Sequence, residues 1–284
     1  MAHTSFCDVC ESRPSQTSQT APRLRHPAQE IYLLQADGWR LIADCLLMNL
    51  DLLSVAAHPD DTELTCGGTI IKTAEAGYKV GLLDLTAGES GTRGNAPLRA
   101  REASRAALAM KIVHRENLGL PDAALEDIRE YKLKIAARIR ALRPATVILP
   151  YWEGRHPDHY TAGRIGYEAC FIAGLAKAPL PGKPFRPRKI IYATLYVPSL
   201  RPTFVVDVTS QFEKKLKAVL CYTSQFSARQ DVQNLFPSRA DLRDRIGSLS
   251  RHFGLMIGVR YGEPFVTREV AAVEDVVTLP GRSV

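Results

Sequence analysis

The chain has 284 residues, of which 45% are hydrophobic and 24% are charged, proportions that are typical of a globular protein and exclude disorder throughout. Its formal net charge is +7, but the Lys and Arg residues form no basic run and do not alternate with aromatic residues, so we expect no nucleic-acid partner. No apolar stretch reaches about 18 residues and no signal-peptide pattern opens the sequence, so we expect a cytoplasmic protein that does not enter a membrane.

Residues 1–47 differ in composition from the remainder. Residues 1–30 are rich in Ser, Thr, Gln, Pro and Arg without periodicity, which predicts disorder, and residues 31–47 suit a short amphipathic helix or an edge strand. Met48 lies directly before the first strong strand pattern. We therefore hypothesise that Met48 is the natural start, that 1–47 is a non-native extension, and that 48–284 forms a single domain.

Strand and helix patterns alternate from Met48 onward. Continuous apolar runs predict strands at 51–57, 78–86, 113–118, 145–152, 190–197 and 203–208. Amphipathic stretches predict helices at 61–76, 97–110, 125–142, 157–176, 209–222 and 238–253. This repeated alternation predicts an α/β fold with a mainly parallel sheet and helices on both faces.

Two segments rich in His and Asp each follow a predicted strand and open a predicted helix. The stretch HPDDTELTCGG begins at His58, and HPDH runs from His156 to His159. In open parallel sheets, ligands bind beyond the carboxyl ends of the strands. We therefore expect both segments at one edge of the sheet.

The residue types in these segments are those of a catalytic metal site. Catalytic zinc usually has three protein ligands and one water, and His58, Asp61 and His159 supply two imidazoles and a carboxylate. Asp60 lies next to one of these ligands, where it would hold the water and take its proton. The spacing thus indicates a metal-dependent hydrolase.

The second segment also offers a group for the transition state. His156 lies one helical turn before His159; protonated, it would stabilise the oxyanion of a tetrahedral intermediate, with Asp158 as its orienting partner. Plainer interpretations remain open, because Asp60 and Asp61 also suit helix N-caps and HPDH also suits a surface turn. The presence of both segments after buried strands favours metal binding.

The loop GESGTRGN (88–95) is rich in Gly but has neither the dinucleotide-binding nor the Walker pattern. It suits an ordinary mobile loop equally well. Functionally, Arg93 and Arg99 would bind carboxylates through their guanidinium groups, and together with the positive net charge they favour an anionic small-molecule substrate.

Three blocks of the sequence resemble a known family. AAHPDDTELTCGGTI, LDLTAGESGTRGNAPLRAREA and YWEGRHPDHYTAGRI are similar to signature blocks of the LmbE-like (PIG-L) zinc-dependent N-acetylglucosaminyl deacetylases, and the similarity runs from about Leu50 to about Val270. More narrowly, they resemble the deacetylase of bacillithiol biosynthesis, which acts on N-acetyl-glucosaminyl L-malate. The resemblance implies a Rossmann-like fold, one Zn²⁺ ion per subunit, an amino-sugar substrate and a homo-oligomer.

The resemblance also implies roles for individual residues. It places zinc ligands at His58, Asp61 and His159, the general base at Asp60, a transition-state-stabilising histidine at His156 and a substrate-contacting arginine at Arg99. Some relatives also use a tyrosine from the C-terminal helical region. The corresponding stretch here, FPSRADLRDRIG, contains none, which leaves that role to His156 and zinc.

The leading hypothesis is a hydrolase that removes the N-acetyl group from an amino-sugar conjugate such as N-acetyl-glucosaminyl L-malate. One alternative is a related deacetylase or amidase that acts on another glycoside or a thiol conjugate. Another is a non-catalytic, metal-dependent binding protein. A nucleotide-binding oxidoreductase is disfavoured because the glycine fingerprint is missing.

Overall fold

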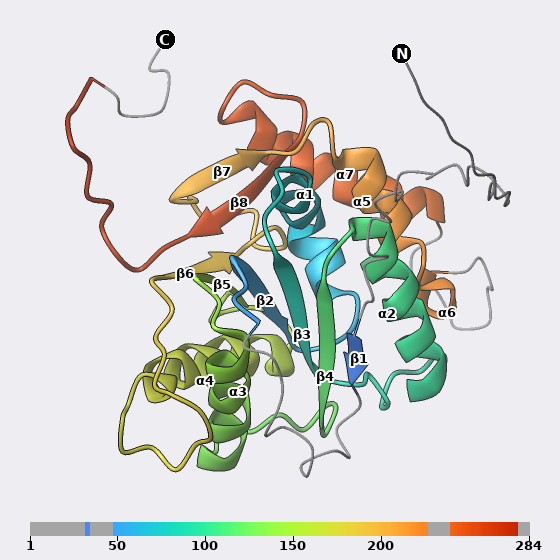
Figure 1. Ribbon diagram of the computed structural model, residues 1–284. Helices are drawn as coiled ribbons and strands as arrows, with labels where there is room; N and C mark the ends of the chain where they lie inside the picture. The colour runs from blue at the N-terminus through green and yellow to red at the C-terminus, as the bar shows by residue number, and fades with distance from the viewer. Residues whose placement is uncertain (1–31, 35–47, 227–238, 278–284) are drawn as a thin grey trace, which may run out of the picture.

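A computed structural model describes residues 32–34, 48–226 and 239–277 (Figure 1). Its strands form a single eight-stranded sheet in the order β1-β4-β3-β2-β5-β6-β8-β7. The strands are β1 (Tyr32–Leu34), β2 (Leu52–Ala56), β3 (Val80–Thr86), β4 (His114–Leu120), β5 (Thr146–Pro150), β6 (Lys189–Ala193), β7 (Phe204–Asp207) and β8 (Gly262–Val266).

The sheet is mainly parallel, as the alternation of elements predicts. Every neighbouring pair from β1 to β6 is parallel, and β8 runs antiparallel to both β6 and β7. The central order β4-β3-β2-β5-β6 is Rossmann-like, since the chain moves outward in one direction from β2 and in the other from β5. The predicted α/β fold class is confirmed.

Helices cover both faces of the sheet (Figure 1). The helices are α1 (Asp61–Glu75), α2 (Ala96–Met110), α3 (Arg129–Leu142), α4 (Pro157–Ala173), α5 (Phe212–Val219), α6 (Thr223–Phe226) and α7 (Arg239–Leu255). One face packs against α3 and α4 and the other against α1 and α2. Helix α5 packs on α1 and α2, and α7 packs against β7 and β8. Within the described part of the chain, no helix has the length and apolar character needed to span a membrane.

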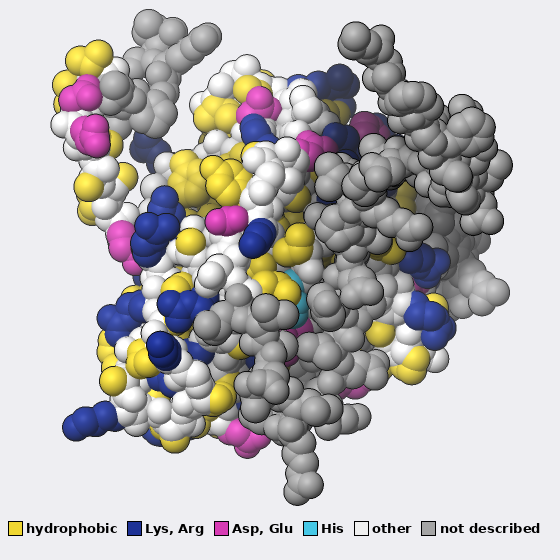
Figure 2. Space-filling view, viewed as in Figure 1, with side chains coloured by type: hydrophobic (Ala, Val, Ile, Leu, Met, Phe, Trp, Pro, Cys, Tyr) yellow, Lys and Arg dark blue, Asp and Glu magenta, His cyan; other side chains and the backbone are white. Residues whose placement is uncertain are grey.

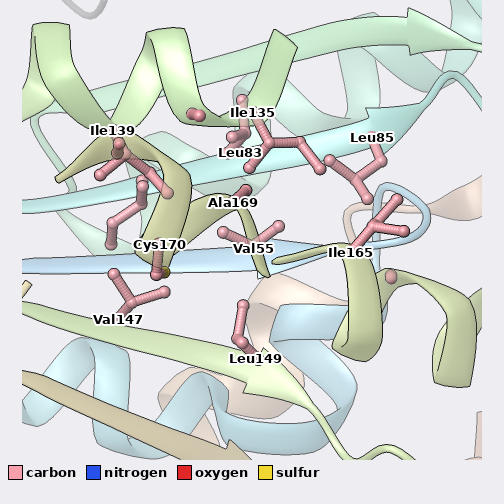
Figure 3. Packing of buried hydrophobic residues seen from close by; sticks show 14 of the residues in the cluster. Val55, Leu83, Leu85, Ile135, Ile139, Val147, Leu149, Ile165, Ala169 and Cys170 are labelled. Carbon is pink, nitrogen blue, oxygen red and sulfur yellow. The ribbon is translucent and has the colours of Figure 1, made fainter. Parts of the chain in front are cut away.

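The core explains why the central strands are continuous apolar runs. Side chains alternate between the two faces of a strand, and here both faces are covered. In β2, Leu53 and Val55 contribute to the core under α3 and α4, whereas Leu52 contributes to the core on the other face. Figure 3 shows the first core, in which Val55, Leu83, Leu85, Val147 and Leu149 meet Ile135, Ile139, Ile165, Ala169 and Cys170.

Helix α3 and strand β8 differ from the sequence prediction. Helix α3 begins at Arg129, because Ile128 is an extended N-cap, so the residues from 125 to 128 are not helical. Strand β8 was not predicted at all. In the N-terminal 47 residues the structure describes only β1, an edge strand beside β4; the predicted disorder of 1–30 lies outside the described residues.

Candidate active site

The HPDD and HPDH segments meet at one edge of the sheet. His58 follows β2, and His156 and His159 lie at the start of α4, which follows β5. Because the direction of strand order reverses between β2 and β5, a crevice opens beyond their carboxyl ends. The ring centroids of His58 and His159 are 5.3 Å apart, and those of His156 and His159 are 4.6 Å apart.

Donor atoms of three residues converge with the spacing of a metal site. Nδ1 of His58 is 3.2 Å from Oδ2 of Asp61 and 3.3 Å from Nε2 of His159, and Oδ1 of Asp61 is 3.2 Å from the same Nε2. Ligand atoms of a tetrahedral ion with bonds of about 2.0–2.1 Å lie about 3.3–3.4 Å apart. His58, Asp61 and His159 therefore fit the ligand set of one tetrahedral divalent ion.

The opposite nitrogen of His58 is held by two buried carboxylates. Its Nε2 lies 3.1 Å from Asp158 Oδ2 and 2.9 Å from Asp122 Oδ1. A carboxylate on one ring nitrogen fixes the tautomer, which leaves the lone pair of Nδ1 free for a metal. Sequence reasoning missed Asp122, although it lies just beyond the end of β4, at the same edge of the sheet as the two motifs.

The structure corrects the role expected for Asp158. Its carboxylate accepts hydrogen bonds from His58 Nε2 and from the backbone N–H groups of Ala123 and Leu125, at 3.1, 2.8 and 3.3 Å. It thus positions His58 and not the His156 ring. His156 instead accepts a hydrogen bond at Nδ1 from the Asp158 backbone N–H, at 3.2 Å, as the side-chain N-cap of α4.

A second His/Asp group, composed of His58, His156 and Asp158, also has its ligand atoms close together. The Asp158 carboxylate already accepts three hydrogen bonds, and Nδ1 of His156 caps a helix. The group formed by His58, Asp61 and His159 is therefore the better candidate for a metal.

The metal-site candidate attracts positive charge. Burial alone lowers the pKa of His58, but the hydrogen bond and charge of Asp61 and the charge of Asp122 raise it to about 10. Burial likewise lowers the pKa of His159, and Asp61 raises it above its ordinary value overall. Burial would raise the pKa of Asp61, yet the two imidazoles hold it well below its usual range. A proton or a divalent cation satisfies the same need.

Asp60 is directed away from its neighbour Asp61. Its backbone is left-handed, with φ of 108°, and its side chain makes no cap hydrogen bond although it occupies the N-cap position of α1. The Asp60 carboxylate lies instead 3.1 Å from the Arg99 guanidinium. Side-chain capping therefore does not account for Asp60. Burial raises its pKa, and despite the lowering effect of Arg99 the pKa reaches about 7.

Both arginines that are expected to bind substrate form hydrogen bonds within the protein. Arg99 is buried, pairs with Asp60 and donates a hydrogen bond to the Pro59 carbonyl, so it supports the HPDD turn. Arg93 is half-buried, and its backbone carbonyl accepts a hydrogen bond from Gln225. The Gly-rich loop has a separate structural role, because the Ser90 N–H donates to the Asp122 carboxylate.

His156 is suited to be neutral. Partial burial and the neighbouring imidazoles of His159 and His58 lower its pKa below the ordinary value. Because Nδ1 accepts a hydrogen bond in the cap of α4, the proton of the neutral ring is assigned to Nε2. The lowered pKa and this hydrogen bond favour a neutral imidazole that donates from Nε2 over the protonated ring expected from the sequence.

These groups border a cavity of about 850 Å³. Asp61, His156 and His159 line it, together with residues from the ends of β5 and β6 and from α7. Neither Arg93 nor Arg99 is among its described lining residues. In Figure 2, histidine surface is visible next to hydrophobic side chains on the face shown.

Comparisons with known proteins identify the family of the chain. Residues 53–170 match the family model described as GlcNAc-PI de-N-acetylase, or PIG-L. Diacetylchitobiose deacetylase of Thermococcus kodakarensis is 33% identical over 228 residues, which cover 75% of this chain and 80% of the relative. The chain belongs to the PIG-L family. As a PIG-L protein with relatives named as deacetylases, it is a hydrolytic N-deacetylase.

Other PIG-L relatives extend the likeness. A probable N-acetyl-alpha-D-glucosaminyl L-malate deacetylase of Bacillus anthracis is 28% identical, covering 63% of this chain and 82% of that protein. A conserved protein from Thermus thermophilus, known from its crystal structure, is 39% identical, with a TM-score of 0.72 and coverage of 79% of this chain and 98% of the other. This PIG-L deacetylase thus shares its fold with the Thermus thermophilus protein over 79% of its own length.

Proposed function

We propose that this PIG-L protein is a zinc-dependent hydrolase that removes the N-acetyl group from an amino-sugar conjugate. The observation that carries the proposal is the convergence of His58 Nδ1, Asp61 and His159 Nε2 within 3.2–3.3 Å of one another. Directly beside them lies Asp60, a buried carboxylate whose pKa is raised to about 7 by burial. A metal site next to a proton acceptor of matched pKa is the arrangement that amide hydrolysis requires.

His58, Asp61 and His159 would hold one zinc ion per subunit, which supplies an acidified water as nucleophile and a Lewis acid for the acetyl oxygen. Asp122 and Asp158 orient His58 from its far side. Such outer partners fix the direction of the ligand ring and raise its basicity.

Asp60 would transfer protons, and His156 would stabilise the negative charge that develops on the acetyl oxygen. Asp60, ionised, takes the proton of the water that attacks the acetyl carbon, and returns a proton to the amine nitrogen as the C–N bond breaks. His156 donates a hydrogen bond from Nε2 to the oxygen that becomes negative in the tetrahedral intermediate. The products are acetate and the free amino sugar, and the proton that Asp60 takes from water ends on the amine nitrogen.

Two substrates are proposed for the amino-sugar conjugate. N-acetyl-glucosaminyl L-malate, the substrate expected from the sequence in bacillithiol biosynthesis, is supported by the likeness to the Bacillus anthracis protein. A diacetylated disaccharide is supported by the likeness to the Thermococcus kodakarensis enzyme. Arg93 and Arg99 are not among the described residues that line the cavity, so they lend no support here to an anionic substrate.

The test is acetate release from a panel of acetylated sugars, measured with zinc present, after chelation and after zinc is restored. We expect release that chelation abolishes and zinc restores. Zinc binding without acetate release from any conjugate would favour the non-catalytic alternative. Release that is unaffected by chelation would contradict the metal-dependent mechanism.

A further inference from the structure

The segment between β5 and α4, which we call the 151–156 loop, brings His156 to the cavity but has few contacts of its own. Residues 153–155 are exposed, and no hydrogen bond between described residues involves 152–155. A Cβ atom added at Gly154 would meet nothing within 4 Å, so the tip of the loop packs on no described neighbour. The 151–156 loop must therefore be held at its ends.

Trp152 holds the end of the loop that follows β5. Its neighbours Tyr151 and Glu153 line the cavity, whereas Trp152 is not among the described lining residues. The Trp152 ring packs instead on Tyr192 of β6, with ring centroids 4.5 Å apart and an angle of 89° between the ring planes. This edge-to-face arrangement is a favourable one for aromatic pairs, and Tyr192 is fully buried, so it offers a fixed surface.

Arg268 lies against the same aromatic side chains. Its guanidinium carbon is 4.5 Å from the ring centroid of Trp152, 4.3 Å from that of Tyr167 in α4 and 5.4 Å from that of Tyr192. A cation within about 6 Å of a ring centroid is attracted by the negative face of the ring. Within the described part of the chain the Arg268 side chain forms no hydrogen bond or ion pair, so these rings are its partners.

The backbone fixes where Arg268 lies. Strand β8 pairs antiparallel with β6 and ends two residues before Arg268. The Thr267 N–H donates a hydrogen bond to Thr203 Oγ1 at 3.1 Å, and the Thr267 hydroxyl donates to the Glu269 carbonyl, also at 3.1 Å. Little backbone freedom is therefore lost when the side chain stacks on the rings.

We propose that Arg268 is a positioning residue of the active site, which joins Trp152 to α4 and thereby holds the 151–156 loop with His156 facing the metal site. Tyr167, the ring nearest to the guanidinium, belongs to the helix that His156 caps. A planar guanidinium both attracts and stacks on such rings. The expected effect on turnover rests on the proposed deacetylation, whereas the effect on the loop does not.

Trypsin cleavage after Arg155 measures how firmly the loop is held. Arg155 is exposed, and its cleavage rate follows the fraction of molecules in which the loop opens. In the zinc-loaded full chain, Arg268→Met should accelerate this cleavage about 3- to 10-fold, because the attraction to the rings is lost. Cleavage after Lys177, an exposed residue beyond α4, is the internal reference. Arg268→Lys keeps the charge but not the planar stack, so its rate should lie between the two.

The matched control is Arg186→Met. The Arg186 guanidinium carbon lies 4.7 Å from the ring centroid of Phe171, close to the other end of α4, so this variant removes a contact of the same kind away from the loop. Cleavage after Arg155 should keep its wild-type rate. Equal acceleration in Arg186→Met and Arg268→Met would mean general loosening of the protein and would overturn the proposal.

Acetate release from the panel of acetylated sugars connects the loop to the reaction. In Arg268→Met, kcat/KM should fall about 3- to 10-fold, while zinc affinity, measured by chelator competition, should stay within about twofold because none of the three rings is a candidate ligand. If no sugar releases acetate but cleavage after Arg155 accelerates, the loop-holding role stands and the proposed reaction fails. Unchanged cleavage overturns the role even in an active enzyme. Faster cleavage with unchanged kcat/KM contradicts the positioning of His156.

Discussion

Asp60 and Asp61 are adjacent carboxylates with opposite proton affinities. The pKa of Asp61 is held well below its usual range by two imidazoles, while burial raises that of Asp60 to about 7. The left-handed backbone of Asp60, at φ of 108°, turns the two side chains apart. Such strain in a non-glycine residue is maintained only where the surroundings enforce it, which suits a division of labour between ligand and base.

Replacing Asp60 tests this division at the level of one residue. Asp60→Asn keeps the shape of the side chain but cannot accept the proton of water, so we expect kcat to fall by about 10²- to 10⁴-fold. Zinc content, measured by metal analysis, should not change because Asp60 is outside the ligand set. A variant with wild-type turnover would refute its role as base.

Arg99 should tune the pH at which the enzyme works. The base must be ionised, so kcat/KM should fall as the pH drops through the Asp60 pKa. Because the Arg99 guanidinium lowers that pKa, Arg99→Gln should move the acid limb to higher pH, by about one unit or more. The measurement is a pH profile of kcat/KM, with Arg99→Lys as the charge-retaining control; a limb that stays in place would contradict the pairing.

At the scale of elements, the first turn of α4 presents His156, Asp158 and His159 together. This turn is brought to the sheet by close packing of α4 on β5. A Cβ atom added at Gly163 would lie 2.5 Å from the Pro150 carbonyl oxygen, a backbone atom that cannot swing aside. The position of the histidines therefore depends on a glycine one to two helical turns away.

Gly163→Ala should displace α4 and disturb the metal site. We expect a loss of about 1–3 kcal/mol in the free energy of unfolding, as for other overpacked sites, together with weaker zinc binding. Urea unfolding and chelator competition measure the two effects. Gly247→Ala in α7 is the control, since its added Cβ would make only ordinary contact with Phe212, at 3.6 Å; equal behaviour of the two variants would count against the packing argument.

The strands that the sequence predicted best are those buried on both faces, because such strands must be continuously apolar. Strand β8 escaped prediction because Glu263 and Pro264 interrupt its apolar pattern. The start of α3 was misplaced for a different reason. Leu125 and Ile128 fit the helical period, but the Leu125 N–H bonds to Asp158, 33 residues away, and periodicity carries no information about such a partner.

At the scale of the whole molecule, one buried ion pair ties three elements together behind the site. Lys215 of α5 and Glu263 of β8 are fully buried, with Nζ 2.6 Å from Oε1. Glu263 also accepts hydrogen bonds from the backbone N–H groups of Gly68 and Thr69 in α1, at 2.9 and 2.7 Å. The helix that begins with the HPDD motif is thereby anchored to the antiparallel end of the sheet.

Lys215→Met should be strongly destabilising. It leaves Glu263 buried without its cation, which typically costs about 3–5 kcal/mol of unfolding free energy, measurable by urea denaturation. The neighbouring Lys214 is half-exposed and pairs with Glu75 on the surface, so Lys214→Met should cost no more than about 1 kcal/mol. Similar losses in both variants would show that burial of the pair is not the cause.

The site could be predicted in part, for a physical reason. That His58, Asp61 and His159 lie together could be predicted because parallel strands bring the segments that follow them to one edge. Asp122 was missed because it comes from another loop and has no motif of its own. The prediction that Asp158 orients His156 was wrong. Hydrogen bonds from backbone N–H groups, which the sequence does not reveal, decide where the Asp158 carboxylate lies.

We propose that His58 Nδ1, Asp61 and His159 Nε2 bind one zinc ion. The most direct measurement is a crystal structure of the zinc-loaded enzyme with anomalous diffraction at the zinc absorption edge. We expect one strong peak about 2 Å from each of these three ligands. A peak bound instead to Asp158 and His156, or no peak at this edge of the sheet, would contradict it.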